Sequence, residues 1–236
     1  MVYKDIQECL VLIFQGVKRI LQESIIGIDL AVDNTAAISN NTGVSPVIVK
    51  GGLVKSTNQF HNKQMAKLRS INDIQYKHNK RYQRYTGVIR LITNKRNRII
   101  NDLFHKLSLG IINYALFNDI DTTVIGHNEL WKQNVNMGNK NNQNFVQIPF
   151  NRLISMIKYK GEENGIDVIL QEESYTSKCS FIDNESIEGH EKYLGRKIKR
   201  ELFKSANGIL INADVDGSYN ILKKAFPDAF TDGIEG

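Results

Sequence analysis

Two aspartates stand in settings typical of metal-dependent phosphoryl chemistry. Asp29 lies inside the apolar run 25–30 (IIGIDL), where a charge is costly unless a cation or a hydrogen-bond network meets it. Asp214 opens an expected helix, and a side chain in a first helical turn can face a neighbouring strand. Hydrolysis of a phosphodiester by two Mg²⁺ ions needs a cluster of carboxylates that holds the metals about 3.5–4 Å apart. Taken singly, the structural alternatives are a helix N-cap for Asp214 and a hydrogen-bonded strand acid for Asp29.

A third carboxylate would complete such a cluster, and three glutamates are candidates. Glu129 follows an expected strand at 122–128, whereas Glu172 and Glu173 lie near the end of an expected strand at 167–174. Because neighbouring strand residues point to opposite faces, at most one of Glu172 and Glu173 faces the aspartates. A solvent-facing loop is the better interpretation of Glu129. The residues alone leave the choice of the third acid open.

The elements that would position these acids follow a definite order. β-rich runs at 25–33, 35–40 and 47–50, separated by turn signals, precede two long amphipathic helices at about 56–84 and 88–117. The strand at 122–128, a helix at about 149–164, the strand at 167–174, a polar irregular stretch at 175–210 and a last helix from about Ala213 to Pro227 follow. This order predicts an α/β mixed sheet with an antiparallel hairpin first, as in an RNase H-like domain.

Positive charge is concentrated between Lys55 and Lys106. That segment holds thirteen basic and two acidic residues, a net charge of +11, whereas the other 184 residues carry a net charge of −5. Because so few acids are present to pair with these bases, nucleic-acid binding by the helical pair is favoured over a solvated helical hairpin. The expected phosphate-binding residues are Lys63, Lys67, Arg69, Lys77, Lys80, Arg81, Arg84 and Arg90.

Composition excludes several classes of protein. The chain has 236 residues, of which 41% are hydrophobic, and a net charge of +6, which argues against disordered and fibrous proteins. No apolar run approaches the roughly 18–20 residues of a membrane span, so we expect a cytoplasmic protein without membrane contact. Neither Cys9 nor Cys179 has a second cysteine at Cys-x-x-Cys spacing, so a structural zinc site is not expected.

Several blocks of sequence, in order, resemble one family. They are GIDLAVDN (27–34), VIVKGG (47–52), the basic helical pair, NQNFVQIPFNRLISMIKYKGEENGIDV (142–168), EESYTSKCS (172–180) and NADVDGSYNIL (212–222). Together they resemble the OrfB/TnpB proteins of bacterial insertion sequences. The resemblance implies a RuvC-like, Mg²⁺-dependent nuclease related to type V CRISPR effectors, which cuts DNA under the direction of an RNA from the element's own end. It also implies that Asp29 and Asp214 match the first and last catalytic aspartates.

The chain departs from the family pattern in three places. The family commonly has a Glu where Gly126 stands, and we expect its role to have moved to Glu173, with Glu172 as the alternative. Paired cysteine knuckles usually follow the TSKCS motif, but only Cys179 remains here, and His190 would still leave the site two ligands short. Family members also usually extend further at the N-terminus, whereas about 24 residues precede the first strand here.

These observations define the expected organisation and function. We expect an N-terminal remnant at 1–24 and a RuvC-like nuclease domain at 25–230, which contains the basic helical pair at 56–117 and a degenerate, formerly zinc-binding segment at 175–210 that binds target nucleic acid. Asp29, Glu173 and Asp214 would hold Mg²⁺, with DNA and a guide RNA as partners. The alternative is a nucleic-acid-binding remnant of the same family that has lost cleavage.

Overall fold

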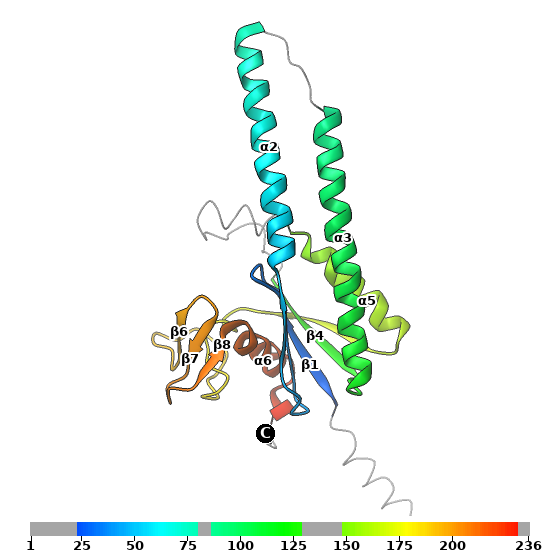
Figure 1. Ribbon diagram of the computed structural model, residues 1–236. Coiled ribbons are helices and arrows are strands. Elements are labelled where there is room, and N and C mark those ends of the chain that lie inside the picture. The colour runs from blue at the N-terminus through cyan, green and yellow to red at the C-terminus, as the bar shows by residue number, and fades with distance from the viewer. Residues whose placement is uncertain (1–22, 80–85, 129–147, 231–236) are drawn as a thin grey trace, which may run out of the picture.

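A computed structural model describes residues 23–79, 86–128 and 148–230 as a mixed α/β structure (Figure 1). The larger sheet contains β1 (Ile25–Asp29), β2 (Asn34–Asn40), β3 (Val47–Lys50), β4 (Thr122–His127) and β5 (Asp167–Glu172). The helices are α2 (Gly52–Asn79), α3 (Thr86–Phe117), α5 (Phe150–Glu163) and α6 (Ala213–Ala225), followed by the short 3₁₀ helix η1 (Pro227–Phe230). Every helix and strand expected for the larger sheet and its covering layers is present, with boundaries shifted by a few residues.

The larger sheet is mixed, with the strand order β3-β2-β1-β4-β5. β1 pairs antiparallel with β2 and parallel with β4, and β4 pairs parallel with β5. The predicted antiparallel hairpin is therefore confirmed. Because β1, β4 and β5 run in the same direction, their carboxyl ends lie along one edge of the sheet. This is the edge at which ligands bind in sheets of parallel strands.

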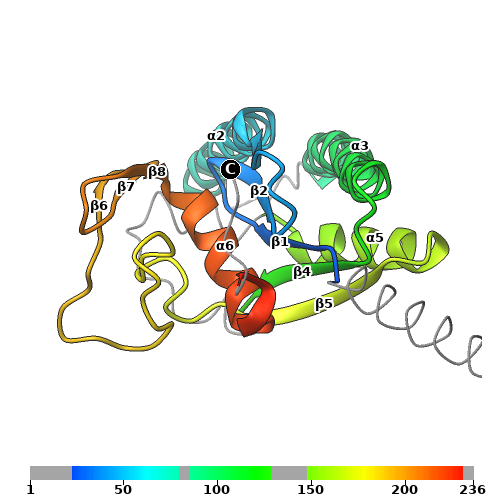
Figure 2. The same ribbon diagram turned by 90° about the horizontal axis from the view of Figure 1, so that it is seen from below.

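Helices cover both faces of the larger sheet (Figure 2). One face carries the main apolar core, in which Ile26 and Ile28 of β1 and Ile125 of β4 pack against α3 and α5. The opposite face is covered by α6, whose Ile221 and Leu222 pack against Ile25 and Val124. Since successive strand residues alternate between faces, Gly27 and Asp29 of β1 lie on the face that α6 covers.

Two glycines allow α6 to pack closely on this face. A Cβ atom at Gly27 would stand 2.4 Å from the Ser218 carbonyl oxygen, and a Cβ atom at Gly126 would stand 2.5 Å from Cδ1 of Ile221. Both distances are too short for a carbon atom, so a larger residue at position 27 would push the backbone of α6 outward, and one at position 126 would displace the Ile221 side chain. The absence of a side chain at Gly27 therefore sets the height of α6 over β1, and Gly126 leaves room for the Ile221 side chain.

Helices α2 and α3 form a long pair that projects from one end of the sheet (Figure 1). They contact each other through polar side chains, since Arg96 donates to Asn58 Oδ1 at 2.8 Å and His61 Nε2 lies 3.2 Å from Thr93 Oγ1. The C-terminal half of α3 also buries Ile100, Phe104 and Ile111 against the sheet. The pair is thus anchored in the core at its base, while its distal turns lie outside the sheet. Across the described ranges, no helix is both long and apolar enough to cross a membrane.

The prediction of an irregular stretch at 175–210 was wrong for its second half. This stretch contains β6 (Arg196–Lys199) and β7 (Leu202–Lys204), which join β8 (Leu210–Asn212) in a small antiparallel sheet of order β6-β7-β8. Its strands are only three or four residues long, and β6 (RKIK) has three charged residues in four, so hydrophobic periodicity gave little signal. Phe203, which is buried, is the main apolar residue of this sheet.

The small sheet is tied to the larger one by ion pairs. Arg200 pairs with Asp33, and Lys50 pairs with Glu201 at 3.2 Å. Asp33 also accepts a hydrogen bond from Lys55, at the start of α2, at 2.7 Å. Asp33 therefore links the small sheet to the base of the helical pair.

Candidate active site

Three carboxylates lie at the edge where the parallel strands end. Asp29 is the last residue of β1, and Glu173 directly follows the last residue of β5. Asp214 lies in the first turn of α6, immediately after β8. The chain thus brings together acids that are up to 185 positions apart in the sequence.

The Asp29 carboxyl group is the centre of this cluster. Its Oδ2 lies 3.0 Å from the position that a Cβ atom of Gly217 would occupy, so it faces the N-terminal part of α6. The residue keeps some accessible surface, but protein surrounds its carboxyl group, and this burial raises the pKa of Asp29 well above its usual range. The negative charges of Glu173 and Asp214 raise the pKa further, whereas Lys197 of β6 lowers it. Both other acids therefore lie close enough to act on Asp29 electrostatically.

The Asp214 carboxylate is held by Asn34. The side-chain amide of Asn34 donates to Asp214 Oδ2 at 2.6 Å, and Asn34 itself is fully buried in β2. The helix N-cap is Asn212, whose Oδ1 accepts from the backbone N–H groups of Asp214 and Val215 at 3.0 and 3.3 Å. The alternative of Asp214 as the N-cap is therefore wrong, and its carboxylate is directed to the strands instead.

Asn34 is a site residue that the sequence did not reveal. The sequence Asp33-Asn34 is typical of a turn and was predicted to form one, but Asn34 is the first residue of β2. Its Oδ1 is buried and makes no hydrogen bond within the described residues. This oxygen is therefore able to accept a hydrogen bond in addition to the one that the amide donates to Asp214. Nothing in the local sequence distinguishes an Asn that begins a turn from one that supports a carboxylate 180 residues away.

The three candidates for the third acid lie in different surroundings. Glu173 Oε2 lies 3.1 Å from where a Cβ atom of Gly126 would stand, so it lies over the end of β4. Glu172 is instead occupied at the surface, where it accepts from Lys224 at 2.7 Å and from the backbone N–H of Ser174 at 2.8 Å. Those contacts lower the pKa of Glu172 against the opposing effect of burial. Glu129 lies outside the described residues.

The cluster fits a hard divalent cation by its chemistry. Carboxylate oxygens are the ligands that Mg²⁺ prefers, and a cation would offset the repulsion that raises the pKa of Asp29. As they stand, however, no three His, Cys, Asp or Glu side chains in the described part of the chain are gathered closely enough to hold an ion together. Ion binding at these residues would therefore require the side chains to move closer together.

The loop between β5 and β6 is organised by buried polar side chains. Asn220 of α6 donates to the carbonyl oxygens of Thr176 and Cys179 at 2.9 and 2.8 Å. Glu185 accepts from the backbone N–H groups of Ser180 and Leu194, both at 2.8 Å. The Cys179 thiol is buried and contacts the Glu188 carbonyl oxygen at 3.6 Å. These contacts fix the segment in which the family usually carries cysteine knuckles.

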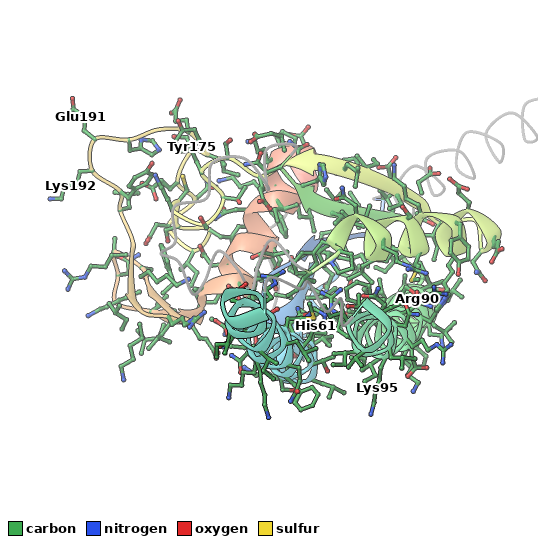
Figure 3. All side chains as sticks on the ribbon, turned by 90° about the horizontal axis from the view of Figure 1, so that it is seen from above. His61, Arg90, Lys95, Tyr175, Glu191 and Lys192 are labelled. Atoms are coloured by element: carbon green, nitrogen blue, oxygen red, sulfur yellow. The ribbon has the colours of Figure 1, made fainter. Side chains whose placement is uncertain are left out.

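The predicted phosphate-binding residues lie on the helical pair. Lys63, Lys67 and Arg69 of α2 and Arg90 of α3 are exposed. Lys95 of α3 is also exposed, and Figure 3 shows it with Arg90 on the helical pair. Arg96 does not belong to this exposed set, because it donates to Asn58 between the helices. The Lys77 side chain and residues Lys80, Arg81 and Arg84 lie outside the described part of the structure.

Comparisons with known proteins agree with this architecture. Residues 16–132 match the OrfB_IS605 family model, described as "Probable transposase", and residues 150–221 match the model described as "Cas12f1-like, TNB domain". A search of curated proteins found no match. The chain belongs to the OrfB/TnpB family.

Solved structures with a similar fold are larger than this chain. A Cas12f1–sgRNA–target DNA complex, solved by cryo-electron microscopy, matches with a TM-score of 0.58 and 19% identity over 84% of this chain and 49% of that one. A CRISPR–Cas12f ternary complex matches with the same TM-score and identity over 84% of this chain and 38% of that one. The chain thus spans about half or less of the length of these proteins. At this identity, the similarity concerns the fold.

Proposed function

We propose that this chain is an RNase H-like, RuvC-type endonuclease domain that hydrolyses DNA with Mg²⁺. The observation that carries the proposal is that Asp29, Glu173 and Asp214 meet at the carboxyl edge of the sheet, where the carboxyl group of Asp29 is buried. Three acids placed in this way are costly to the fold unless a cation is part of the function. Membership of a transposase family and the sheet order β3-β2-β1-β4-β5 support the proposal.

The protein's own groups have distinct roles in this proposal. Asp29, Glu173 and Asp214 would hold Mg²⁺, which activates water and stabilises the leaving oxygen when bound. Asn34 fixes the orientation of Asp214 through its amide. Lys197, whose charge reaches Asp29, would attract the phosphate of the substrate toward the carboxylates.

The helical pair would hold the nucleic-acid backbone beside this site. Lys63, Lys67, Arg69 and Arg90 are exposed and have few acidic neighbours to pair with, so they suit contact with phosphates. We propose DNA as the substrate and a guide RNA as a second partner. The similar Cas12f1 structure is a complex with an sgRNA and target DNA, which supports this choice of partners.

A cleavage assay tests the proposed function. The purified chain is incubated with single-stranded DNA and Mg²⁺, beside Asp29→Asn, which keeps the shape of the side chain and removes its charge. We expect nicking by the native chain, and its loss in the variant and in EDTA. Equal nicking by both proteins would assign the activity to a contaminant. No nicking by either, with DNA still bound, would support a binding protein without cleavage.

A further inference from the structure

Two tyrosines and a lysine form an aromatic cluster on the loop that follows β5, in which Tyr175 and Lys178 are exposed and Tyr193 is half-buried. The Lys178 ammonium lies 5.8 Å from the centre of the Tyr175 ring and 5.9 Å from the centre of the Tyr193 ring, so both rings contact one cation. The His190 ring meets Tyr193 edge-on at 5.4 Å. Tyr175 retains 43% of its surface exposed, which is a large fraction for an aromatic residue in an ordered loop.

The backbone holds Tyr175 rigidly in this exposed position. Its φ angle is +68°, a left-handed conformation that costs a non-glycine residue about 1 kcal/mol or more. Its carbonyl oxygen accepts from the N–H groups of Lys178 and Cys179 at 3.0 and 3.1 Å. Asn220 of α6 then clamps this turn from the interior, through the carbonyl oxygens of Thr176 and Cys179. The ring is therefore presented on a fixed turn of the chain.

Gly189 makes room for the Tyr175 ring. A Cβ atom at this position would lie 3.3 Å from Cε1, Cζ and the hydroxyl oxygen of Tyr175, so the ring packs against a bare backbone there. Within the described residues, the hydroxyl groups of Tyr175 and Tyr193 make no hydrogen bond. The surroundings thus support the Tyr175 ring without enclosing it.

We propose that Tyr175, supported by Lys178 and Tyr193, is a stacking site for an unpaired base of single-stranded DNA. This inference rests on the proposed function for the choice of DNA. Exposed aromatic rings beside a cation are the usual platform for sequence-tolerant stacking of bases, because every base has a π face. Tyr175 is two residues from Glu173 in the chain, so the ring belongs to the segment that directly follows the carboxylate at the end of β5. Figure 3 shows Tyr175 on the loop side of the molecule, apart from His61, Arg90 and Lys95 of the helical pair.

Binding of a thymidine oligonucleotide tests the stacking site. Affinity is measured by fluorescence anisotropy with EDTA present, so that cleavage plays no part, for the full native chain and for Tyr175→Leu and Tyr175→Phe. We expect Tyr175→Leu to bind about tenfold more weakly and Tyr175→Phe to bind like the native chain. The slope of log affinity against log salt should be the same for all three, because no phosphate contact is lost.

A matched control and a modified ligand separate stacking from damage to the fold. Tyr159 of α5 is 41% exposed and lies 5.9 Å from the Lys160 ammonium, but on the opposite side of the sheet, so Tyr159→Leu should bind normally. An oligonucleotide of the same length without bases should bind equally to the native chain and to Tyr175→Leu. The proposal is overturned if Tyr175→Leu binds the thymidine oligonucleotide as tightly as the native chain, if it loses the same affinity for both ligands, or if the native chain binds neither. Each of these results is independent of whether the chain cuts DNA.

Discussion

The carboxylate of Glu173 lies over Gly126, with Oε2 3.1 Å from the position of a Cβ atom on that glycine. The family resemblance implies a glutamate at position 126. Here the space above the glycine is filled by Ile221 of α6, which would stand 2.5 Å from such a Cβ atom. An acid rooted in β4 would therefore require the Ile221 side chain to move. An acid at the end of β5 supplies a carboxylate to the same place without moving that side chain.

Glu173→Gln should abolish the proposed cleavage while leaving the fold intact. The substitution keeps the size of the side chain but removes one of three negative charges around the proposed ion. We expect a loss of nicking rate on the order of 100-fold or more, since even the partners of metal ligands contribute 10- to 100-fold. The measurement is the rate of nicking of single-stranded DNA at saturating Mg²⁺.

Glu172→Gln is the matched control for this experiment. Glu172 is adjacent in the sequence, but it pairs with Lys224 at the surface, where an ion pair contributes about 0–1 kcal/mol. Its nicking rate should stay within about twofold of the native rate. A larger loss from Glu172→Gln than from Glu173→Gln would mean that the third acid has been assigned to the wrong residue.

The larger sheet could be predicted from the sequence because its strands have a strong local signal. Residues 25–30 are apolar except for Asp29, and residues 122–125 are all β-branched, as expected for buried strands. The apolar residues of α3 recur every three or four positions, which likewise predicts a helix. Asp29 was identifiable for the same reason, since it is a charge inside such an apolar run.

The small sheet and the supporting residues could not be predicted in this way. β6 has the sequence RKIK and is exposed throughout, so its pairing with β7 leaves no periodic apolar pattern. Asn34 and Gly126 gain their roles from α6, which approaches from more than 90 positions away in the sequence. Only the three-dimensional contacts show that Asn34 holds Asp214 and that Gly126 leaves room for Ile221.

Gly27→Ala should destabilise the protein, because the added methyl group would collide with the backbone of α6 and force the helix away from β1. The new Cβ atom would lie 2.4 Å from the Ser218 carbonyl oxygen and 2.9 Å from Leu222 Cβ. Overpacking of this kind costs about 1–3 kcal/mol in the free energy of unfolding, measurable by urea denaturation. Gly110→Ala is the control, since nothing lies within 4 Å of its Cβ position on α3, and alanine should stabilise that helix by up to about 1 kcal/mol. Equal stability of the two variants would show that α6 is not seated on Gly27.

The buried carboxyl group of Asp216 should make stability depend on pH. Burial raises its pKa to about 7, and the charges of Asp183 and Glu185 add to this effect, although the backbone N–H of Phe181 donates to Asp216 Oδ1 at 3.1 Å and opposes it. The folded chain therefore holds this proton more tightly than the unfolded chain, whose aspartate pKa is about 3.9. It follows that the free energy of unfolding falls as pH rises from about 4 to about 7, by at most about 1.4 kcal/mol per pH unit.

Asp216→Asn removes this titration and isolates its contribution. The variant should be more stable than the native chain above pH 7, and its advantage should shrink as pH falls toward about 4. Melting temperatures of the native chain and of Asp216→Asn, measured across this pH range, give the difference in stability between them. Asp102→Asn, on the exposed surface of α3, is the control. A constant difference between the native chain and Asp216→Asn at all pH values would contradict the assignment of this titration to Asp216.

Neutralising exposed lysines on α2 should change the salt dependence of DNA binding. Lys63 and Lys67 are one helical turn apart and both exposed, so a strand that follows the helix can contact both. If each neutralises one phosphate, the double variant Lys63→Gln/Lys67→Gln should reduce the slope of log affinity against log salt by about 1.4 for single-stranded DNA. Lys106→Gln should leave the slope unchanged, because Lys106 already pairs with Asp102 at 2.8 Å. A weaker affinity with an unaltered slope would mean that α2 supports the fold or another contact, and that the phosphates are bound elsewhere.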